Sequence, residues 1–180
     1  MGWNTGKLIF RRILAFLIDY LVITGYSVLL LGTALLVVRL TGGEMTAPDP
    51  VNGQLIGFFT LTLPVFLYFY LMESGKRRAT LGKLKIGLVV RIPQETGVRG
   101  RRIFIRNLLK FLPWEVAHTG VHWIVYYSLR EQFPPVWVYV LLTLPQLIIL
   151  FYFVSMALSG GDSTLYDRAA RTRVIPQGES

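Results

Sequence analysis

Four blocks of mostly apolar residues dominate this sequence, and each block is long enough to cross a lipid bilayer. The hydrocarbon core of a bilayer is about 30 Å thick, which an α-helix crosses in roughly 20 residues. The blocks cover residues 13–38, 55–72, 113–129 and 136–158. The third block is the most polar, because it contains Glu115, His118 and His122. The sequence therefore predicts an all-α fold, a polytopic membrane bundle of four transmembrane helices within one domain of residues 1–180.

The overall composition agrees with this fold class. Hydrophobic residues make up 53% of the chain and charged residues only 16%, whereas a soluble domain has about 25% charged residues. The chain has no cysteine, which excludes disulfides and thiolate metal sites. The first apolar block is also far longer than the roughly 7–15 apolar residues of a signal peptide, so we expect a retained helix there.

The positions of the basic residues predict the orientation of the bundle. Of the 19 Lys and Arg residues, all but Arg39 and Arg130 lie before the first block, between the second and third, or after the fourth. Basic residues remain on the cytoplasmic side of a membrane. We therefore expect both termini and a loop over residues 73–112 in the cytoplasm, with the connection Leu40–Asn52 outside.

Part of the cytoplasmic loop forms a predicted basic patch that faces the lipid bilayer. Anionic lipid headgroups attract each nearby basic residue by about 1 kcal/mol. The residues expected in this patch are Lys76, Arg77, Arg78, Lys83, Lys85, Arg101 and Arg102. Nucleic acid is a poorer partner, because the basic residues adjoin the spans and the loop has few aromatic groups on which bases could stack.

Similar motifs occur in the same order in both halves of the sequence. The matches are Leu61–Pro64 with Leu142–Pro145, Thr80-Leu81 with Thr164-Leu165, and Val89-Val90 with Val174-Ile175. They fit a tandem repeat of two helical hairpins, each followed by a short cytoplasmic segment. Chance similarity between apolar sequences is the alternative explanation.

Asp19 is an ionisable residue inside the first apolar block. Such a group costs about 2.5–3.5 kcal/mol near the bilayer centre, so it needs a partner or a wet cavity. Residues spaced by seven lie on one face of a helix, and Arg12, Asp19, Tyr26 and Thr33 have this spacing. One hypothesis is a structural ion pair between Asp19 and Arg12 or Arg106. The other is an ion or proton pocket formed by Asp19, Glu115, His118 and His122.

The sequence contains no recognisable catalytic arrangement. A nucleophile elbow, a phosphate-binding loop, a zinc-protease motif and an EF-hand are all absent from it, so we expect neither an enzyme nor a cofactor. Glu115 and His118 have the spacing of half a di-iron bundle site. That site needs a second such pair and further glutamates, which the sequence lacks, and we therefore predict no metal site.

Several short motifs, which together span roughly residues 10–175, resemble the RDD family of membrane proteins. They are Arg12-x-x-Ala15-Phe16-x-Ile18-Asp19, Thr80-Leu81-Gly82-Lys83-x-x-x-Gly87-x-x-Val90, Arg106-Asn107, and Asp167-Arg168 leading to Thr172-x-Val174. The arginine and two aspartates that name the family correspond to Arg12, Asp19 and Asp167. The sequence departs from the family pattern at Tyr166, where a His is common, and at Ala170-Arg171.

The resemblance implies a bacterial inner-membrane protein and leaves two functions open. Some family members are suggested to be cation–proton antiporters, and others have assembly roles. The first hypothesis is a small solute or cation/proton transporter, acting as a homo-oligomer, with Asp19 as its coupling carboxylate. The second is a non-transporting membrane adaptor or assembly factor that binds lipid or a membrane protein partner. In that case Arg12, Asp19, Arg106 and Asp167 form a structural charge network.

Overall fold

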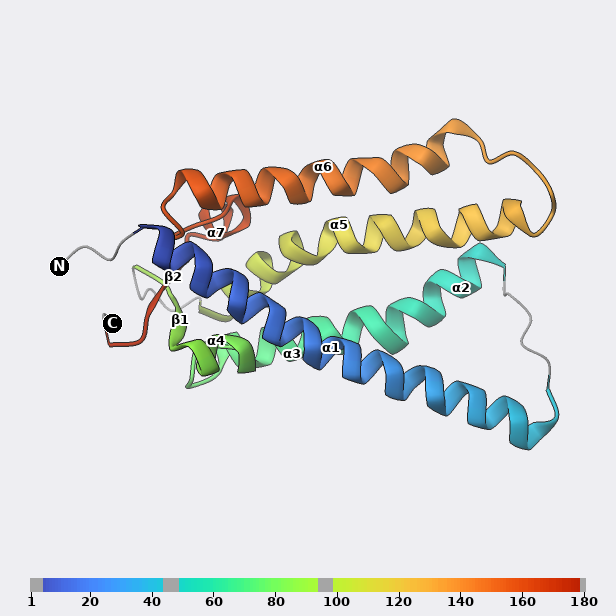
Figure 1. Ribbon diagram of the computed structural model, residues 1–180, viewed down its shortest axis with the longest axis horizontal. Coiled ribbons are helices and arrows are strands. Elements are labelled where there is room, and N and C mark those ends of the chain that lie inside the picture. Colours follow the sequence, from blue (N-terminus) through green and yellow to red (C-terminus); the bar gives the residue numbers. More distant parts are fainter. Residues whose placement is uncertain (1–4, 44–48, 94–98, 179–180) are drawn as a thin grey trace.

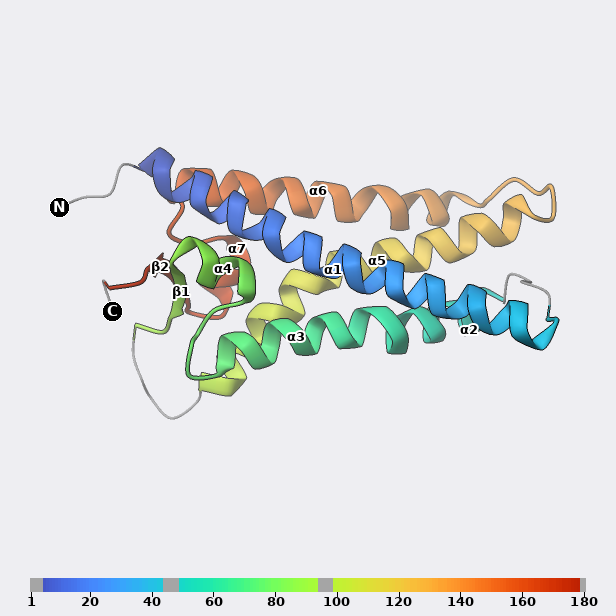
Figure 2. The same ribbon diagram turned by 60° about the horizontal axis from the view of Figure 1, so that its bottom comes forward.

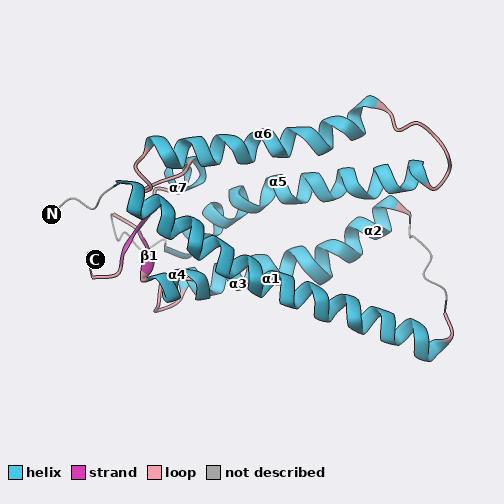
Figure 3. Cartoon of the chain, viewed as in Figure 1, coloured by secondary structure: helices cyan, strands magenta, loops and turns pink. Residues whose placement is uncertain are grey.

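The structure is a computed structural model that describes residues 5–43, 49–93 and 99–178, and long helices dominate it (Figures 1 and 3). The helices are α1 (Thr5–Thr41), α2 (Pro50–Gly57), the π-helical segment η1 (Phe58–Thr62), α3 (Leu63–Ser74), α4 (Leu81–Ile86), α5 (Arg99–Ser128), α6 (Val136–Leu158) and α7 (Leu165–Ala169). Two strands, β1 (Leu88–Arg91) and β2 (Arg173–Pro176), complete the fold. The start of α1, the short helices α4 and α7 and both strands gather at one end of the bundle, which we call the basal end.

Within the described residues, three helical segments are long and apolar enough to cross a membrane. They are Gly6–Thr41, Pro50–Ser74 and Val136–Leu158, and they contain the first, second and fourth predicted spans. α5 is 30 residues long but is not apolar enough to join this group. The chain is thus mostly helical with several membrane-spanning helices, while a fourth span and the orientation of the termini stay predictions.

The structure corrects two boundaries expected from the sequence. α5 begins at Arg99, so residues 99–112 belong to a continuous helix and not to the predicted loop 73–112. Proline is common in the first turn of a helix, which made Pro113 a plausible start, but Pro113 lies inside α5. The fold is also not purely helical, because β1 and β2 form a small sheet.

Two tyrosines donate hydrogen bonds to backbone carbonyls that lie just before helix prolines. Proline has no N–H, so the carbonyl four residues before it loses its helical hydrogen bond. The Tyr152 hydroxyl donates to the carbonyl of Leu109, four residues before Pro113, at 2.8 Å. The Tyr26 hydroxyl donates at 2.5 Å to the carbonyl of Thr60, in the π-helical segment just before Pro64. Each bond ties a backbone carbonyl of one helix to a side chain of another.

The two halves of the chain contain the same order of elements. In each half, long helices are followed by a short helix and then by a strand. Thr80 caps the start of α4 and Thr164 caps the start of α7. β1 pairs with β2 in antiparallel register, with Val90 opposite Val174. This order agrees with the predicted repeat, and the strands join one half to the other.

The hydrophobic core at the basal end lies beneath the small sheet. Leu88, Val90, Ile103 and Val174 are fully buried there. α1 packs closely on α4, because a Cβ added to Gly82 would lie only 2.0 Å from the carbonyl oxygen of Ala15. Figure 2 shows α4 tucked beneath the first turns of α1. The basal end therefore holds the first half of α1 firmly in place.

We predict that Tyr152→Phe lowers the free energy of unfolding by about 1 kcal/mol, as expected for a hydrogen bond between membrane helices. The variant leaves the Leu109 carbonyl without its donor. Thermal unfolding in detergent measures the change, and Tyr139→Phe is the matched control, since Tyr139 is on the same helix and half-exposed. Equal midpoints for the two variants would show that the hydroxyl of Tyr152 contributes nothing.

Candidate functional site

Charged side chains from five helices, α1, α3, α4, α5 and α7, converge at the basal end of the bundle. We call this group the charge cluster, and its members are Arg12, Asp19, Glu73, Lys83, Arg106, Lys110 and Asp167. All except Lys110 are at least nine-tenths buried. Buried charges are stable only when they are paired or hydrogen-bonded, so the partners of each group determine what the cluster can do.

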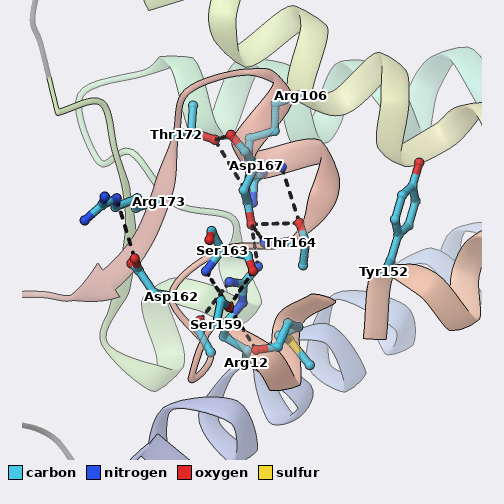
Figure 4. Close-up of polar contacts among 12 residues, drawn as sticks. Arg12, Arg106, Tyr152, Ser159, Asp162, Ser163, Thr164, Asp167, Thr172 and Arg173 are labelled. Atoms are coloured by element: carbon cyan, nitrogen blue, oxygen red, sulfur yellow. Dashed lines mark hydrogen bonds and ion pairs between the residues drawn. The ribbon is translucent and has the colours of Figure 1, made fainter. Parts of the chain in front are cut away.

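Asp167 is held by two arginines and by the start of its own helix (Figure 4). Its Oδ2 accepts from Arg12 Nη2 at 2.8 Å, and its Oδ1 accepts from Arg106 Nε at 2.7 Å. Oδ2 also accepts from the backbone N–H of Thr164 at 3.0 Å, which completes a capping box at the start of α7. Burial alone would raise the pKa of Asp167, but Arg106 and Arg12 outweigh it and hold that pKa below its usual range.

Glu73 is a fully buried member of the cluster that sequence analysis does not single out. Its Oε2 lies 2.5 Å from Arg106 Nη1, and its Oε1 lies 2.8 Å from Lys83 Nζ. Asn107 Nδ2 also donates to Oε2, at 3.1 Å. The available signal was a lone acidic residue between an apolar block and a basic loop. Arg106 thus bridges Glu73 in the first half and Asp167 in the second.

Asp19 does not pair with an arginine, in contrast to the structural hypothesis from the sequence. Its Oδ1 accepts from the Tyr68 hydroxyl and from the Gly82 N–H, both at 2.8 Å, and its Oδ2 accepts from the Thr80 hydroxyl at 2.6 Å. These donors lie on α3 and at the start of α4. The carboxylate of Asp19 therefore fastens α1 to α4 next to the ion pairs.

Three residues of the predicted ion pocket, Glu115, His118 and His122, lie in α5, and their contacts differ from those of Asp19. Glu115 accepts a hydrogen bond from Gln54 on α2, whereas the partners of Asp19 lie on α3 and α4. Nδ1 of His118 lies 3.0 Å from the carbonyl oxygen of Trp114 on its own helix. His122 faces Gly57, where an added Cβ would lie 3.5 Å from Nε2.

One residue of the predicted basic patch does not lie on the surface. Lys83 is buried and paired with Glu73, so it cannot belong to the surface. Lys76, Arg77, Lys85 and Arg101 are exposed, and Arg78 and Arg102 are half-buried. A groove of about 700 Å³ is lined by the basic residues Lys76, Arg77, Arg78 and Arg91, together with Leu84, Val89, Val90 and Gln177. We call it the basic groove.

The sequence model of the RDD family matches residues 7–171 of this chain. The match covers nearly the whole chain and includes every member of the charge cluster. No curated protein and no solved structure matches the chain significantly. The family assignment agrees with the resemblance that the short motifs indicated.

We predict that Asp167→Asn lowers the free energy of unfolding by about 3–5 kcal/mol, because it leaves two buried arginines without their charge partner. The matched control is Asp162→Asn, since Asp162 pairs with Arg173 on the surface at 3.5 Å. Such an exposed pair contributes only about 0–1 kcal/mol. Similar losses in both variants, measured by denaturant unfolding, would show that burial does not strengthen the Asp167 pair.

The lowered pKa of Asp167 also predicts how stability depends on pH. A carboxyl whose pKa is lower in the folded than in the unfolded state stabilises the fold above its unfolded pKa, about 3.9 for Asp. That contribution is lost as the pH falls through the folded-state pKa. We therefore expect it to be constant above about pH 5 and to decline in stronger acid. Unfolding midpoints of wild type and Asp167→Asn should converge as the pH falls. A constant difference down to strong acid would contradict this assignment.

Proposed function

This chain belongs to the RDD family of membrane proteins, and on that premise we propose that it is a non-transporting membrane adaptor. In this role the charge cluster fixes the basal end, and the basal end presents a basic surface to a partner. The proposal takes up the second of the two hypotheses that the sequence leaves open.

The observation that carries the proposal is that each carboxylate of the charge cluster is held by donors from other segments. Asp19 has three donors, and Glu73 and Asp167 share Arg106. A coupling carboxylate must exchange its partners during every transport cycle. Breaking one buried ion pair here would cost about 3–5 kcal/mol. The arrangement favours a fixed structural cluster over a group that binds and releases ions.

The basic groove is the surface that such a fixed basal end would present. β1 forms one wall, and β1 is held in place by its pairing with β2 and by α4. Among the described residues that line the groove none is acidic, so its charge would attract and orient an acidic segment of another protein. We propose this acidic segment as the partner.

We further propose that α5 is a fourth span and that the basal end is cytoplasmic, in a bacterial inner membrane. α5 lies alongside α6 over much of its length (Figures 1 and 2). Gly120 permits this approach, because an added Cβ would lie 2.9 Å from Leu142 Cδ2. The basal end carries the basic groove, as the cytoplasmic side of a membrane protein should. A reporter fused after Ser180 should therefore be cytoplasmic, and a periplasmic reporter would overturn the topology.

A transporter is the second candidate, and one observation favours it. Among the described residues, Gln54 Oε1 and Glu115 Oε2 are buried oxygens without a hydrogen-bond partner. Buried polar atoms of this kind need an explanation, and a protonated Glu115 or a bound cation would supply one. In that case Glu115 is a stronger candidate than Asp19 for the coupling carboxylate.

A flux assay in liposomes separates the two functions. We expect purified wild type to show no proton flux in gradients of Na⁺, K⁺ or Li⁺. Flux that disappears in Glu115→Gln or Asp19→Asn, with the variant shown to be folded, would overturn the adaptor and establish the transporter.

Binding of an acidic probe tests the groove directly. Fluorescence anisotropy of a labelled poly-glutamate peptide should show binding that weakens with salt, and the double variant Lys76→Gln/Arg77→Gln should weaken it roughly tenfold, about 1.4 kcal/mol. The matched control is Lys85→Gln/Arg101→Gln, which removes the same charge from exposed positions outside the groove. An equal loss of peptide affinity in both double variants would show that binding depends only on the net charge of the protein.

A further inference from the structure

A cavity of about 250 Å³ lies between α1 and the three helices α3, α5 and α6. One side reaches the charge cluster, where Arg12, Asp19, Lys83, Arg106 and Lys110 line it. The rest of the lining is apolar and aromatic, with Phe16, Ile23, Trp114, Ile149 and Phe153 among its residues. Phe16 is 48% exposed and Phe153 is 47% exposed, so the cavity opens toward the surface that faces lipid.

Lys110 differs from the other cations of the charge cluster. It has no ion pair or hydrogen bond with any described residue, and its Nζ lies 3.4 Å from the centroid of the Phe69 ring. The neighbouring carboxylates of Glu73 and Asp19 are already held, Glu73 by two cations of the cluster and Asp19 by three neutral donors. At formal charge, the four basic residues of the cluster outnumber its three acidic residues, which leaves one positive charge without a partner.

An unpaired ammonium group beside an apolar cavity needs an anion. A contact with an aromatic ring stabilises a cation by only about 0.5–2 kcal/mol. This is less than the free-energy cost of an isolated cation in the membrane interior. The lining also restricts what the anion can be. A small inorganic anion would satisfy Lys110 but would leave the aromatic walls without a partner, whereas a lipid would satisfy both.

We propose that this cavity binds a monoanionic lipid, with its acidic headgroup at Lys110 and an acyl chain along the apolar wall between α1 and α6. One anion matches the one excess charge of the cluster. The volume is slightly below the roughly 300–1,000 Å³ of ordinary ligand sites, so it holds a headgroup and the first part of a chain, and the remainder of the chain extends into the bilayer. The site is separate from the basic groove, and it does not depend on the adaptor role.

Quenching of Trp114 by brominated lipids tests the proposal. Trp114 lines the cavity, and replacing Trp3, Trp123 and Trp137 with Phe makes it the single fluorophore. The protein is placed in phosphatidylcholine nanodiscs that contain brominated phosphatidylglycerol, a brominated fatty acid or brominated phosphatidylcholine. We expect either anionic lipid to quench Trp114 at a roughly tenfold lower mole fraction than the neutral one, a preference of about 1.4 kcal/mol.

The matched variants are Lys110→Gln and Lys85→Gln, because Lys85 is exposed on α4 and does not line the cavity. Lys110→Gln should abolish the preference for anionic lipid, and Lys85→Gln should retain it. Quenching by phosphatidylglycerol identifies a bilayer phospholipid as the ligand, and quenching by the fatty acid alone identifies a free acid. Equal quenching by neutral and anionic lipid would overturn the proposal. So would inorganic phosphate that relieves the quenching as effectively as unbrominated anionic lipid does.

Thermal unfolding provides a second readout that does not depend on fluorescence. A ligand that binds only the folded state raises its stability, so anionic lipid should raise the unfolding midpoint of wild type but not of Lys110→Gln. In neutral detergent, Lys110→Gln should be at least as stable as wild type, because it removes an unpaired charge. A variant that fails to fold would therefore contradict the proposal.

Discussion

The guanidinium group of Arg106 connects the two halves of this protein, and the arrangement of the basal end depends on it. It donates to Glu73 at the end of α3 and to Asp167 in α7. The planar fork of an arginine can hold two carboxylates at a fixed angle, which a lysine cannot do. Glu73 then holds Lys83 in α4, and Asp167 holds Arg12 in α1. An ionic cluster of this kind adds little net stability compared with apolar packing, but the loss of one member is severe.

The sequence predicted the features that depend on composition, such as the membrane spans. It predicted poorly the side-chain contacts between segments that are distant in the chain. Long apolar blocks identified three spans, and the threonines matched between the two halves prove to cap α4 and α7. Arg12, Arg106 and Asp167 do lie together, as the family motifs suggested. The partners of Asp19 are a tyrosine hydroxyl, a threonine hydroxyl and a backbone N–H, groups so common that their positions carry no signal. Glu73 escaped notice because its partners lie 10 and 33 residues further along the chain.

The proposed adaptor surface and the proposed lipid site occupy different parts of the basal end. The basic groove is lined by β1 and by residues 76–78, while the cavity is lined by α1, α3, α5 and α6. α1 packs chiefly on α4, and its outer half has little contact with the other helices. A lipid chain between α1 and α6 would fill space that the protein itself leaves open. Members of the charge cluster line one side of the cavity, and none of them lines the groove.

The pairing of β1 with β2 has a consequence for how the protein is made. Leu88 lies opposite Pro176, so the sheet cannot form until residue 176 has left the ribosome. Helices form from local contacts, but a pairing between distant segments must wait for loop closure. The first hairpin therefore enters the membrane with its strand unpaired and with Arg12 still lacking Asp167. The basal end is therefore completed only after β2 has been made, and a chain interrupted before β2 has an open strand edge by which it can be recognised as unfinished.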